Sequence, residues 1–189
     1  MSEYRIASRY AKSLLDLAVE KKVLEEVNKD MQLLTGIAEE SRDLVLMLKS
    51  PIISHDKKLS VLDKVFKGKV NDMTMSFFTI LTKKHREAYL IPVAEEFHHQ
   101  YNVFKGIEEA TITTTFPLND ALRKEFINLV ERISSKKVEL TEKIDESLIG
   151  GFILKIGDRQ IDDSINSKLK ALRLEFTKTT TKRPIKVIR

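Results

Sequence analysis

The sequence predicts an α+β protein that is mainly α, with an N-terminal six-helix bundle and then a small α/β domain with a short sheet and two helices. Apolar residues recur with a helical period up to about residue 105, and the links between these helices are short. After Gly106, β-branched and alternating patterns replace the helical period. Only 6 of the 189 residues are glycine and 4 are proline, which disfavours a turn-rich all-β fold. The domain boundary is therefore expected between residues 105 and 106.

The first two helices are predicted by their apolar stripes. On the first helix the stripe has three alanines (Ala7, Ala11 and Ala18) beside it, and its members are Ile6, Tyr10, Leu14 and Leu17. The second stripe advances by alternating steps of three and four, which suits helix packing in a bundle, and consists of Leu24, Val27, Met31, Leu34 and Ala38.

Polar capping residues and helix breakers delimit the next four helices. Ser41, Ser54 and Asn71 are of types that cap helix N-termini, and Pro92 fits the first turn of a sixth helix. The breakers that end these helices are Ser50-Pro51, Gly68 and Gly106. The apolar residues of the fourth, fifth and sixth helices are Leu59, Leu62 and Phe66, then Met73, Phe77, Ile80 and Leu81, then Phe97, Tyr101 and Phe104.

The second domain is predicted over residues 106–177, with strands and helices interspersed. Asn119 can cap a helix after the first strand, and Asp163 or Ser164 can cap a last helix. The expected strands are residues 110–116, 138–144, 152–156 and 159–161, the last two joined at the hairpin signal Gly157-Asp158. The apolar positions of its two helices are Leu122, Phe126, Leu129 and Ile133, and then Ile165, Leu169, Leu172 and Phe176. A domain of about 70 residues is thin, so contact with the first domain or a partner would stabilise it.

The net charge of +5 comes entirely from the C-terminus. Residues 178–189 are predicted to be a basic, flexible tail, and they hold five of the 33 lysines and arginines, which leaves 28 bases against 28 acids in the rest of the chain. A neutral body argues against a nucleic-acid partner, because such binders carry a basic face within a domain. The apolar runs are also far shorter than the roughly 18 residues that a membrane span needs, so no membrane insertion is expected.

No group of residues stands out as catalytic or metal-binding. Glu95-x-x-His98 has the spacing of a carboxylate-diiron helix but lacks the second copy that such a site requires, and a solvated helix face is the preferred interpretation. Gly150-Gly151 with Gly157 fails the phosphate-loop pattern, which ends in Gly-Lys-Ser/Thr. A metal cluster is conceivable, but turn and cap positions explain each of its members, Asp145, Asp158, Asp162 and Asp163. There is no cysteine, so thiolate zinc sites and thiol nucleophiles are excluded. We expect no cofactor and a protein that works through its surfaces.

The C-terminal domain carries a specific motif. It reads D-E-S-L-I-G-G from Asp145, then Ile156-Gly157-Asp158, then Ile161-Asp162-Asp163-Ser164, then Leu169 and Leu172. This block resembles the C-terminal signature of the δ subunit family of F-type ATP synthase, called the oligomycin sensitivity-conferring protein in mitochondria. Asp163 departs from the glycine usual there.

Weaker matches in the same order extend the resemblance over residues 4–176. The first helix, Ala7-x-x-Tyr10-Ala11-x-x-Leu14, looks like the opening of the family pattern, with Ser13 in place of a common alanine. Further matches are Ser50-Pro51-x-Ile53 with the following Lys57, Arg86 with Leu90, and Pro117-Leu118. The tail has no family counterpart.

The resemblance implies a non-catalytic peripheral-stalk (stator) subunit. In this family the N-terminal bundle grips N-terminal segments of the catalytic head's α subunits, and the C-terminal domain holds the C-terminal ends of the membrane-anchored b subunits. The stalk stops the head from rotating with the rotor, so that proton transport is coupled to ATP synthesis. The implied location is the cytoplasmic face of the bacterial inner membrane.

The residues also suggest where each grip lies. Helices one and five have enough apolar residues for a core and for a groove that takes a partner helix, although each residue can instead belong to the core. The groove candidates are Ala7, Tyr10, Ala11, Leu14, Phe77, Phe78 and Leu81. Two adjacent glycines predict a positive φ or a backbone approached too closely for a Cβ, and the structural residues expected on the stalk side are Gly150, Gly151, Gly157, Asp158 and Asp162.

Two rival functions remain from other classes. One is a nucleic-acid or anionic-membrane binder acting through the tail, and the other is a small-molecule enzyme using the loop of residues 150–157. Salt separates the first from a stator subunit, because phosphate binding weakens steeply as salt rises whereas an apolar groove hardly responds.

Deleting residues 178–189 tests the role of the tail. The truncated chain loses five positive charges and its net charge falls to zero, yet assembly should be unaffected because the segment has no periodic apolar residues. ATP-driven proton pumping after reconstitution with the other subunits measures this. Loss of pumping would identify the tail as a functional element.

Overall fold

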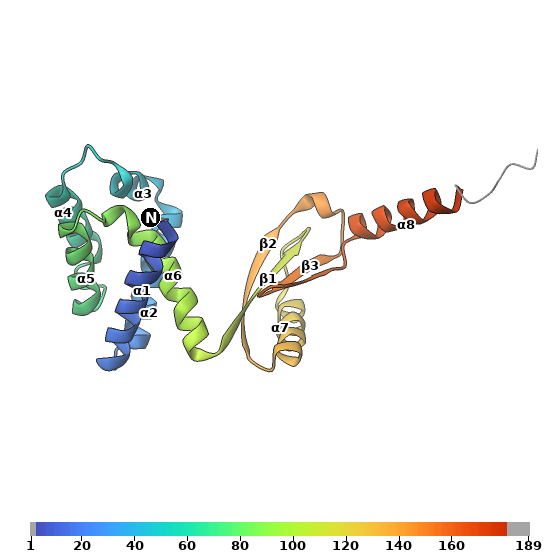
Figure 1. The fold of residues 1–189 in the computed structure, drawn as a ribbon, viewed down its shortest axis with the longest axis horizontal. Coiled ribbons are helices and arrows are strands. Elements are labelled where there is room, and N and C mark those ends of the chain that lie inside the picture. The colour runs from blue at the N-terminus through green and yellow to red at the C-terminus, as the bar shows by residue number, and fades with distance from the viewer. Residues whose placement is uncertain (1–2, 181–189) are drawn as a thin grey trace, which may run out of the picture. The chain divides into compact units, whose positions relative to one another are not determined.

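The chain divides into two compact units, residues 1–105 and 106–189. The structure is a computed structural model that describes residues 3–180 (Figure 1). Among the described residues the protein is mainly helical, with one sheet of four strands. The tail predicted from residue 178 overlaps the last helix as far as Thr180, and its remainder lies outside the described residues.

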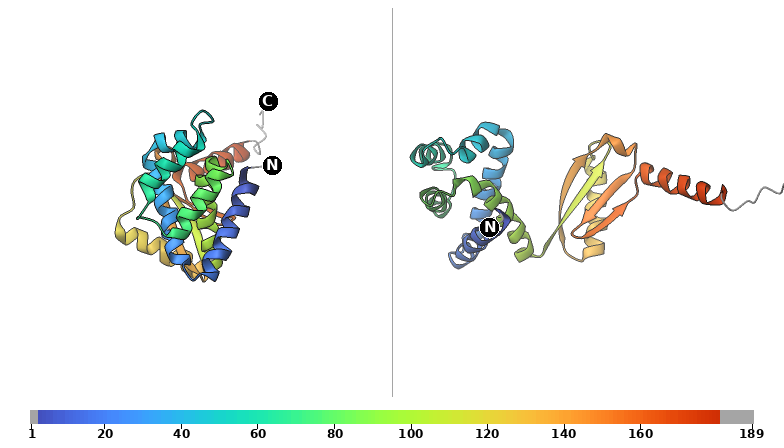
Figure 2. Two further views of the ribbon diagram at one scale, coloured as in Figure 1. Left: turned by 90° about the vertical axis from the view of Figure 1, so that its left-hand side faces the viewer. Right: turned by 45° about the horizontal axis from the view of Figure 1, so that its top comes forward.

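The N-terminal unit is helical throughout its described length. Helix α6 packs against both α1 and α2, while α4 packs against α5, and α1, α2 and α6 run side by side (Figure 2). The helices are α1 (Glu3–Glu20), α2 (Leu24–Glu40), α3 (Arg42–Lys49), α4 (His55–Phe66), α5 (Asp72–Lys83), the 3-10 helix η1 (Glu87–Tyr89) and α6 (Leu90–Lys105). All five residues predicted as the stripe of α2 are buried.

Helix α1 buries a different stripe from the one predicted. Its buried residues are Ala7, Ala11, Leu14, Leu15 and Ala18. Alanines allow α1 to approach α6 closely, so this small-residue side faces the core. Leu17, predicted in the apolar stripe, is instead 40% exposed. Phe104 on α6 and Ile80 on α5 are exposed as well, so these apolar positions do not contribute to the core.

Capping follows the sequence with one exception. Ser41 and Asn71 accept hydrogen bonds from the first-turn amides of α3 and α5, at 3.4 Å and 2.9 Å. Asn119 does the same for α7 (Asp120–Ser134), at 2.8 Å. Ser54 occupies the cap position of α4, but its side chain makes no capping hydrogen bond.

A buried ion pair joins α4 to η1. The Lys58 ammonium donates to the Glu87 carboxylate at 2.8 Å and to the Leu48 carbonyl at the end of α3 at 2.9 Å, and His55 Nδ1 lies 2.9 Å from the same carboxylate oxygen. Both charged side chains are at most 5% exposed. Lys57, the lysine of the family-like motif, is exposed, and the buried lysine of this segment is its neighbour Lys58.

The ion pair sets the ionisation of Glu87. Burial raises the pKa of this carboxyl, but hydrogen bonds from Lys58, the backbone and His55 outweigh it, so that the net pKa is below its ordinary value. Because the pKa of Glu87 is lower in the folded than in the unfolded chain, its ionised form stabilises the fold at pH values above the pKa of an ordinary glutamate. This contribution is lost as the pH falls through the lowered pKa.

A second buried carboxylate fixes α5 to α2. Asp30 accepts hydrogen bonds from the Asn71 amide at 2.8 Å and from the Thr74 hydroxyl at 2.6 Å. Both donors belong to the N-terminus of α5, where unpaired amides and the helix dipole favour a negative charge. The position of α5 is therefore determined by a residue of α2.

The C-terminal unit is a four-stranded sheet with one helix on one face. The strand order is β2-β1-β3-β4, with β1 and β2 parallel and the other pairs antiparallel. The strands are β1 (Ile107–Thr114), β2 (Lys137–Ile144), β3 (Phe152–Ile156) and β4 (Arg159–Asp162). Helix α7 forms the crossover between the parallel strands, as parallel pairing requires (Figure 1).

The core of this unit is small. Alternate residues of β1 are buried, and they meet α7 chiefly through Val130. The core residues are Ala110, Ile112, Leu118, Val130, Leu154 and Ile156. Ile133, predicted to point inward from α7, is exposed. The last helix, α8 (Ile165–Thr180), contributes no member to this core.

Replacing Lys58 with Met tests the buried ion pair. The variant leaves the Glu87 carboxylate buried without its ammonium partner, and breaking such a pair costs about 3–5 kcal/mol. Urea unfolding measures the loss. The matched control is Lys57→Met on the exposed neighbouring position, which should change the free energy of unfolding by less than about 0.5 kcal/mol. Equal unfolding midpoints for both variants would contradict this assignment.

Candidate functional site

The seven predicted groove residues separate into two groups. Five of them are buried in the core of the N-terminal unit: Ala7, Ala11, Leu14, Phe78 and Leu81. Tyr10 and Phe77 remain partly accessible. In the free chain only these two can be reached by a partner, and the five buried residues support them from beneath.

Tyr10 and Phe77 connect α1 to α5. Their ring centroids are 6.4 Å apart in an edge-to-face arrangement, which is favourable for aromatic pairs. Arg86, just after α5, donates a hydrogen bond to the Tyr10 hydroxyl and places its guanidinium 5.5 Å from the centre of the Tyr10 ring. This contact gives a structural role to the Arg86 of the family-like motif.

Apolar residues on both helices continue this pair into what we call the α1–α5 surface. It consists of Ile6, Tyr10 and Leu17 on α1 and Met73, Phe77 and Ile80 on α5. Successive members are three, four or seven residues apart, so each set occupies one face of its helix. Ile80 is 50% exposed and Leu17 is 40% exposed.

Sequence reasoning missed four of these residues as site candidates: Ile6, Leu17, Met73 and Ile80. One signal in the sequence could have identified them. Helix α1 has two apolar stripes, one of small and one of large residues, and a helix on the surface of a bundle needs only one stripe to pack against the core. Of the large stripe, only Tyr10 and Leu14 are among the groove candidates predicted from the sequence, and Leu14 is buried.

Gly150 and Gly151 form a tight joint with the start of α8. A Cβ on Gly151 would lie 2.4 Å from the carbonyl oxygen of Asp163, and the φ of Gly151 is +79°. A Cβ on Gly150 would lie 2.7 Å from the end of the Ile165 side chain. The Gly150 carbonyl also accepts a hydrogen bond from the Ile165 amide at 3.0 Å. Both features predicted for this pair, positive φ and close backbone approach, are present, and we call this joint the glycine clasp.

Asp162 completes the glycine clasp from the other side. Its carboxylate accepts from the Ser164 amide at 2.9 Å and from the Ser167 hydroxyl at 2.7 Å, while the Ser164 hydroxyl accepts from the Ser167 amide at 3.2 Å. The hydrogen bonds from Ser164 and then Ser167 lower the pKa of Asp162. Ser164, not Asp163, therefore caps α8.

The remaining motif residues occupy separate turns. Asp145 accepts from the Ser147 amide at 2.9 Å, and its hydrogen bonds with Ser147 lower the pKa of Asp145. Gly157 and Asp158 form the β3–β4 turn, whereas Asp162 pairs with Ile153 at the opposite end of that hairpin. The structure thus brings Gly150, Gly151 and Asp162 together in the glycine clasp. Gly157 and Asp158 lie outside the clasp, at the other end of the β3–β4 hairpin.

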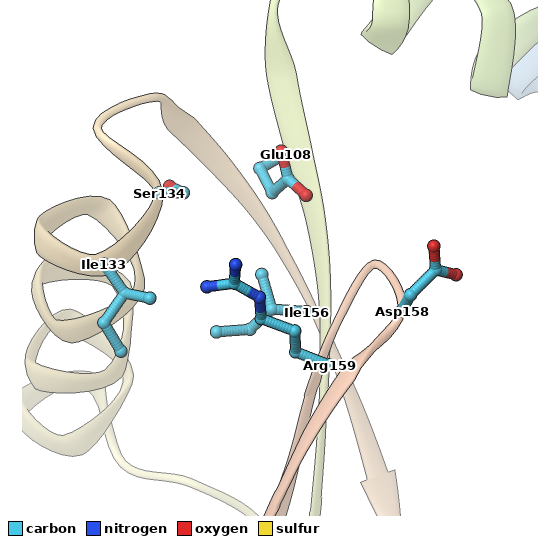
Figure 3. A pocket seen from close by; sticks show the side chains of 6 residues that line it. All are labelled: Glu108, Ile133, Ser134, Ile156, Asp158 and Arg159. Atoms are coloured by element: carbon cyan, nitrogen blue, oxygen red, sulfur yellow. The ribbon is translucent and has the colours of Figure 1, made fainter.

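A cavity of about 360 Å³ lies beside the β3–β4 turn (Figure 3). Its lining residues are Glu108, Ile133, Ser134, Ile156, Asp158 and Arg159. Figure 3 shows the Arg159 guanidinium extending between α7 and the sheet, while the Asp158 carboxylate points away. Glu108 is already paired with Lys136 at 2.9 Å. Of the loop of residues 150–157 that the enzyme hypothesis invoked, only Ile156 lines this cavity, and neither clasp glycine does.

The other candidates from the sequence have structural explanations. His98 is within 3.3 Å of Asn28 and 3.4 Å of Gln32, which are amide side chains of α2 and not carboxylates. Across residues 3–180 no three His, Cys, Asp or Glu residues are grouped as a metal site would require. No helix in the same range has the length and apolarity to cross a membrane.

Exposed apolar helix faces such as those of the α1–α5 surface and of α8 are typical of proteins that bind other proteins. Residues 6–176 match the family model described as the ATP synthase delta (OSCP) subunit. The chain therefore belongs to the ATP synthase delta (OSCP) subunit family, whose members are peripheral-stalk components of F-type ATP synthase and are not themselves catalytic.

Individual relatives agree with this assignment. The chain is 45% identical over 177 residues to the ATP synthase subunit delta of Cytophaga hutchinsonii, covering 94% of this chain and 97% of that protein. It is 39% identical to the subunit delta of Chlorobaculum tepidum, over 92% of this chain and 96% of that protein. A chain of the Toxoplasma gondii mitochondrial ATP synthase has the same fold, with a TM-score of 0.73, 24% identity and coverage of 90% of this chain and 97% of that one.

Replacing Gly151 with Ala tests the glycine clasp. The added Cβ would strain a left-handed backbone by about 1–3 kcal/mol and collide with backbone atoms of Asp163, so α8 should detach from its joint. Amide hydrogen exchange at residues 164–167 should accelerate. Gly157→Ala is the matched control: its φ of +52° imposes similar strain, but its Cβ meets only the flexible end of Glu108 at 3.2 Å. Faster exchange in both variants alike would refute a specific clasp.

Proposed function

We propose that this chain is the stator link of an F-type ATP synthase. Its six N-terminal helices, acting as one bundle, bind N-terminal segments of the α subunits, and its C-terminal unit holds the C-terminal ends of the b subunits. The membrane-anchored stalk then resists the torque that the rotor exerts on the catalytic head. Proton transport is thereby coupled to ATP synthesis, although the chain carries out no chemistry itself.

The observation that carries this proposal is the family match, which spans both units in one alignment over residues 6–176. A stator link needs two separate grips on one chain, and the division at residue 105 supplies two units. The match covers 97% and 96% of the two relatives at 45% and 39% identity, so it extends over both units of this chain.

The grip on the α subunits is assigned to the α1–α5 surface. An amphipathic helix can lay its apolar anchors across Tyr10 and Phe77, between the exposed Leu17 and Ile80. The buried Ala7, Ala11, Leu14, Phe78 and Leu81 support this surface from the core. Arg86 and Asp30 act as positioning residues, because one orients Tyr10 and the other fixes the start of α5.

The grip on the b subunits is assigned to the C-terminal unit. Its motif residues contact one another and not an open site, which fits a structural role for Gly150, Gly151 and Asp162. As part of an ATP synthase in a bacterium, the protein would work at the cytoplasmic face of the inner membrane, held there by its partners.

A pull-down from native membranes tests this function. The tagged full-length chain should recover the α, β and b subunits after mild detergent extraction. Recovery of none of these subunits would overturn the proposal. Recovery of α and β without b would contradict the proposed contact with the b subunits and support only the proposed contact with the catalytic head.

Replacing Phe77 with Ala tests the α1–α5 surface. A buried aromatic anchor contributes roughly 1.5–3 kcal/mol, so the affinity for a peptide copying the N-terminus of the cognate α subunit should fall about ten-fold or more. Titration calorimetry on the full-length chain measures this.

The matched control is Phe104→Ala. Phe104 is 55% exposed and lies with Tyr4 and Lys12 on the opposite side of α1, so its loss should leave peptide affinity unchanged. Thermal unfolding of both variants verifies that they fold. Equal affinities of the two variants would show that the α segment binds elsewhere.

A further inference from the structure

Two of the four histidines pack their rings against each other in the N-terminal unit. His55 is the first residue of α4, and His85 lies in the turn after α5. Their ring centroids are 3.8 Å apart, at an interplanar angle of 54°. His85 is exposed and His55 is partly exposed, so protons reach both rings from solvent. Because histidine is the side chain whose charge changes near neutral pH, two titratable groups are here in direct contact.

His85 occupies a backbone position that glycine usually takes. Its φ is +57°, in the left-handed region, and its amide donates to the Thr82 carbonyl at 2.9 Å. The next amide, that of Arg86, donates to the Leu81 carbonyl at 2.9 Å. These two bonds form the Schellman motif, in which glycine is the most common left-handed residue. Compared with glycine, the histidine adds backbone strain and an imidazole, whose charge depends on pH.

The turn connects the histidine pair to two other parts of the unit. Arg86 follows His85 and donates a hydrogen bond to the Tyr10 hydroxyl of the α1–α5 surface. Glu87 comes next, and its carboxylate lies 2.9 Å from His55 Nδ1. Three consecutive residues thus contact the start of α4, the α1–α5 surface and the buried ion pair. A displacement of His85 would change the position of Arg86 against Tyr10, because the two residues are adjacent in the chain.

The charges around the pair favour one added proton over two. Against the effect of burial, hydrogen bonds from Lys58, the backbone and His55 hold the pKa of Glu87 below its ordinary value, so this carboxylate stays ionised where histidine titrates. A first proton on His55 therefore faces a negative charge. A second proton, on His85, would place two positive charges 3.8 Å apart. In surroundings as polar as water, repulsion at this distance corresponds to about a six-fold change in an equilibrium constant.

The other groups at this junction also oppose a second proton. The segments that meet here add three basic residues and one acid, besides two tyrosines: Lys49 at the end of α3, Asp56 on α4, Lys84 and Arg86 after α5, Tyr89 on η1 and Tyr10 on α1. Lys58 already balances the charge of Glu87. The surroundings therefore supply no excess of negative charge for a doubly protonated pair.

We propose that the His55–His85 pair is a proton-sensitive latch on the turn of residues 84–86, closed while at most one ring is protonated and opened by protonation of both. Opening the latch moves Arg86 away from Tyr10 and weakens the hold of the α1–α5 surface on its partner. This effect on binding rests on the proposed stator function, since it regulates the same surface. The latch itself is a property of the free chain.

Two measurements on the full-length chain test the latch, each made at about pH 7.5 and about pH 5.5, on either side of the usual pKa of histidine. The first is the hydrogen-exchange protection of the His85 and Arg86 amides, corrected for the intrinsic exchange rate at each pH. The second is the affinity for a peptide copying the N-terminus of the cognate α subunit, by titration calorimetry. In the unmodified chain both should fall about five-fold at the lower pH, as the repulsion predicts.

His85→Asn removes one titratable ring and keeps the left-handed backbone, which asparagine tolerates. Because this variant has no second proton to bind, its protection and affinity should change less than about two-fold between the two pH values. His99→Asn is the matched control, since His99 lies on α6 beside Tyr4 and Phe104, and it should respond like the unmodified chain. Titration of the peptide itself is common to all three chains, so the differences between chains carry the result. Thermal unfolding at both pH values verifies that the variants fold.

Each outcome decides separately on the latch and on the function. A response in the unmodified chain and in His99→Asn that is absent from His85→Asn supports the latch. Protection that does not change with pH in the unmodified chain, or an equal response in His85→Asn, overturns it. A fall in protection with constant peptide affinity overturns the coupling to the α1–α5 surface. Absence of peptide binding at both pH values counts against the proposed contact with the α subunits, and the protection values then decide on the latch alone.

Discussion

Close approach of α1 to α6 through the alanine stripe is the constraint on which the N-terminal unit depends. Ala7, Ala11 and Ala18 are almost completely buried, and larger side chains there would separate the two helices. Helix α1 also buries Leu14 and Leu15, but the large residues on its other side are left out of this contact. Tyr10 and Leu17 therefore lie away from this contact, where they are available to a partner.

The same logic operates in the C-terminal unit with glycine in place of alanine. Gly151 lets the chain pass so close to Asp163 that no side chain would fit, and this closeness fixes the base of α8. In both units one close contact between elements depends on small residues, while some large apolar residues stay on the surface. For the proposed stator function this distribution is favourable, because an exposed apolar surface that is rigid before binding loses less entropy when a partner binds.

Buried charged residues determine the positions of the helices that are not held by contacts through small residues. Asp30 fixes the start of α5, and Lys58 with Glu87 joins α4 to η1. Such pairs contribute little net stability compared with apolar packing, but breaking one leaves a buried charge without a partner. They therefore specify one arrangement of short helices whose apolar faces alone would allow several.

The sequence by itself determined the elements and the family. Helical periods, the caps Ser41, Asn71 and Asn119 and the motif around Gly150–Gly151 are local patterns, and local patterns report local structure. Only the tertiary structure decided which of the two stripes of α1 faces the core, that β1 pairs in parallel with β2, and that Lys58 meets Glu87. These outcomes depend on contacts between residues that are far apart in the chain. Local sequence patterns do not indicate which distant residue each side chain will contact.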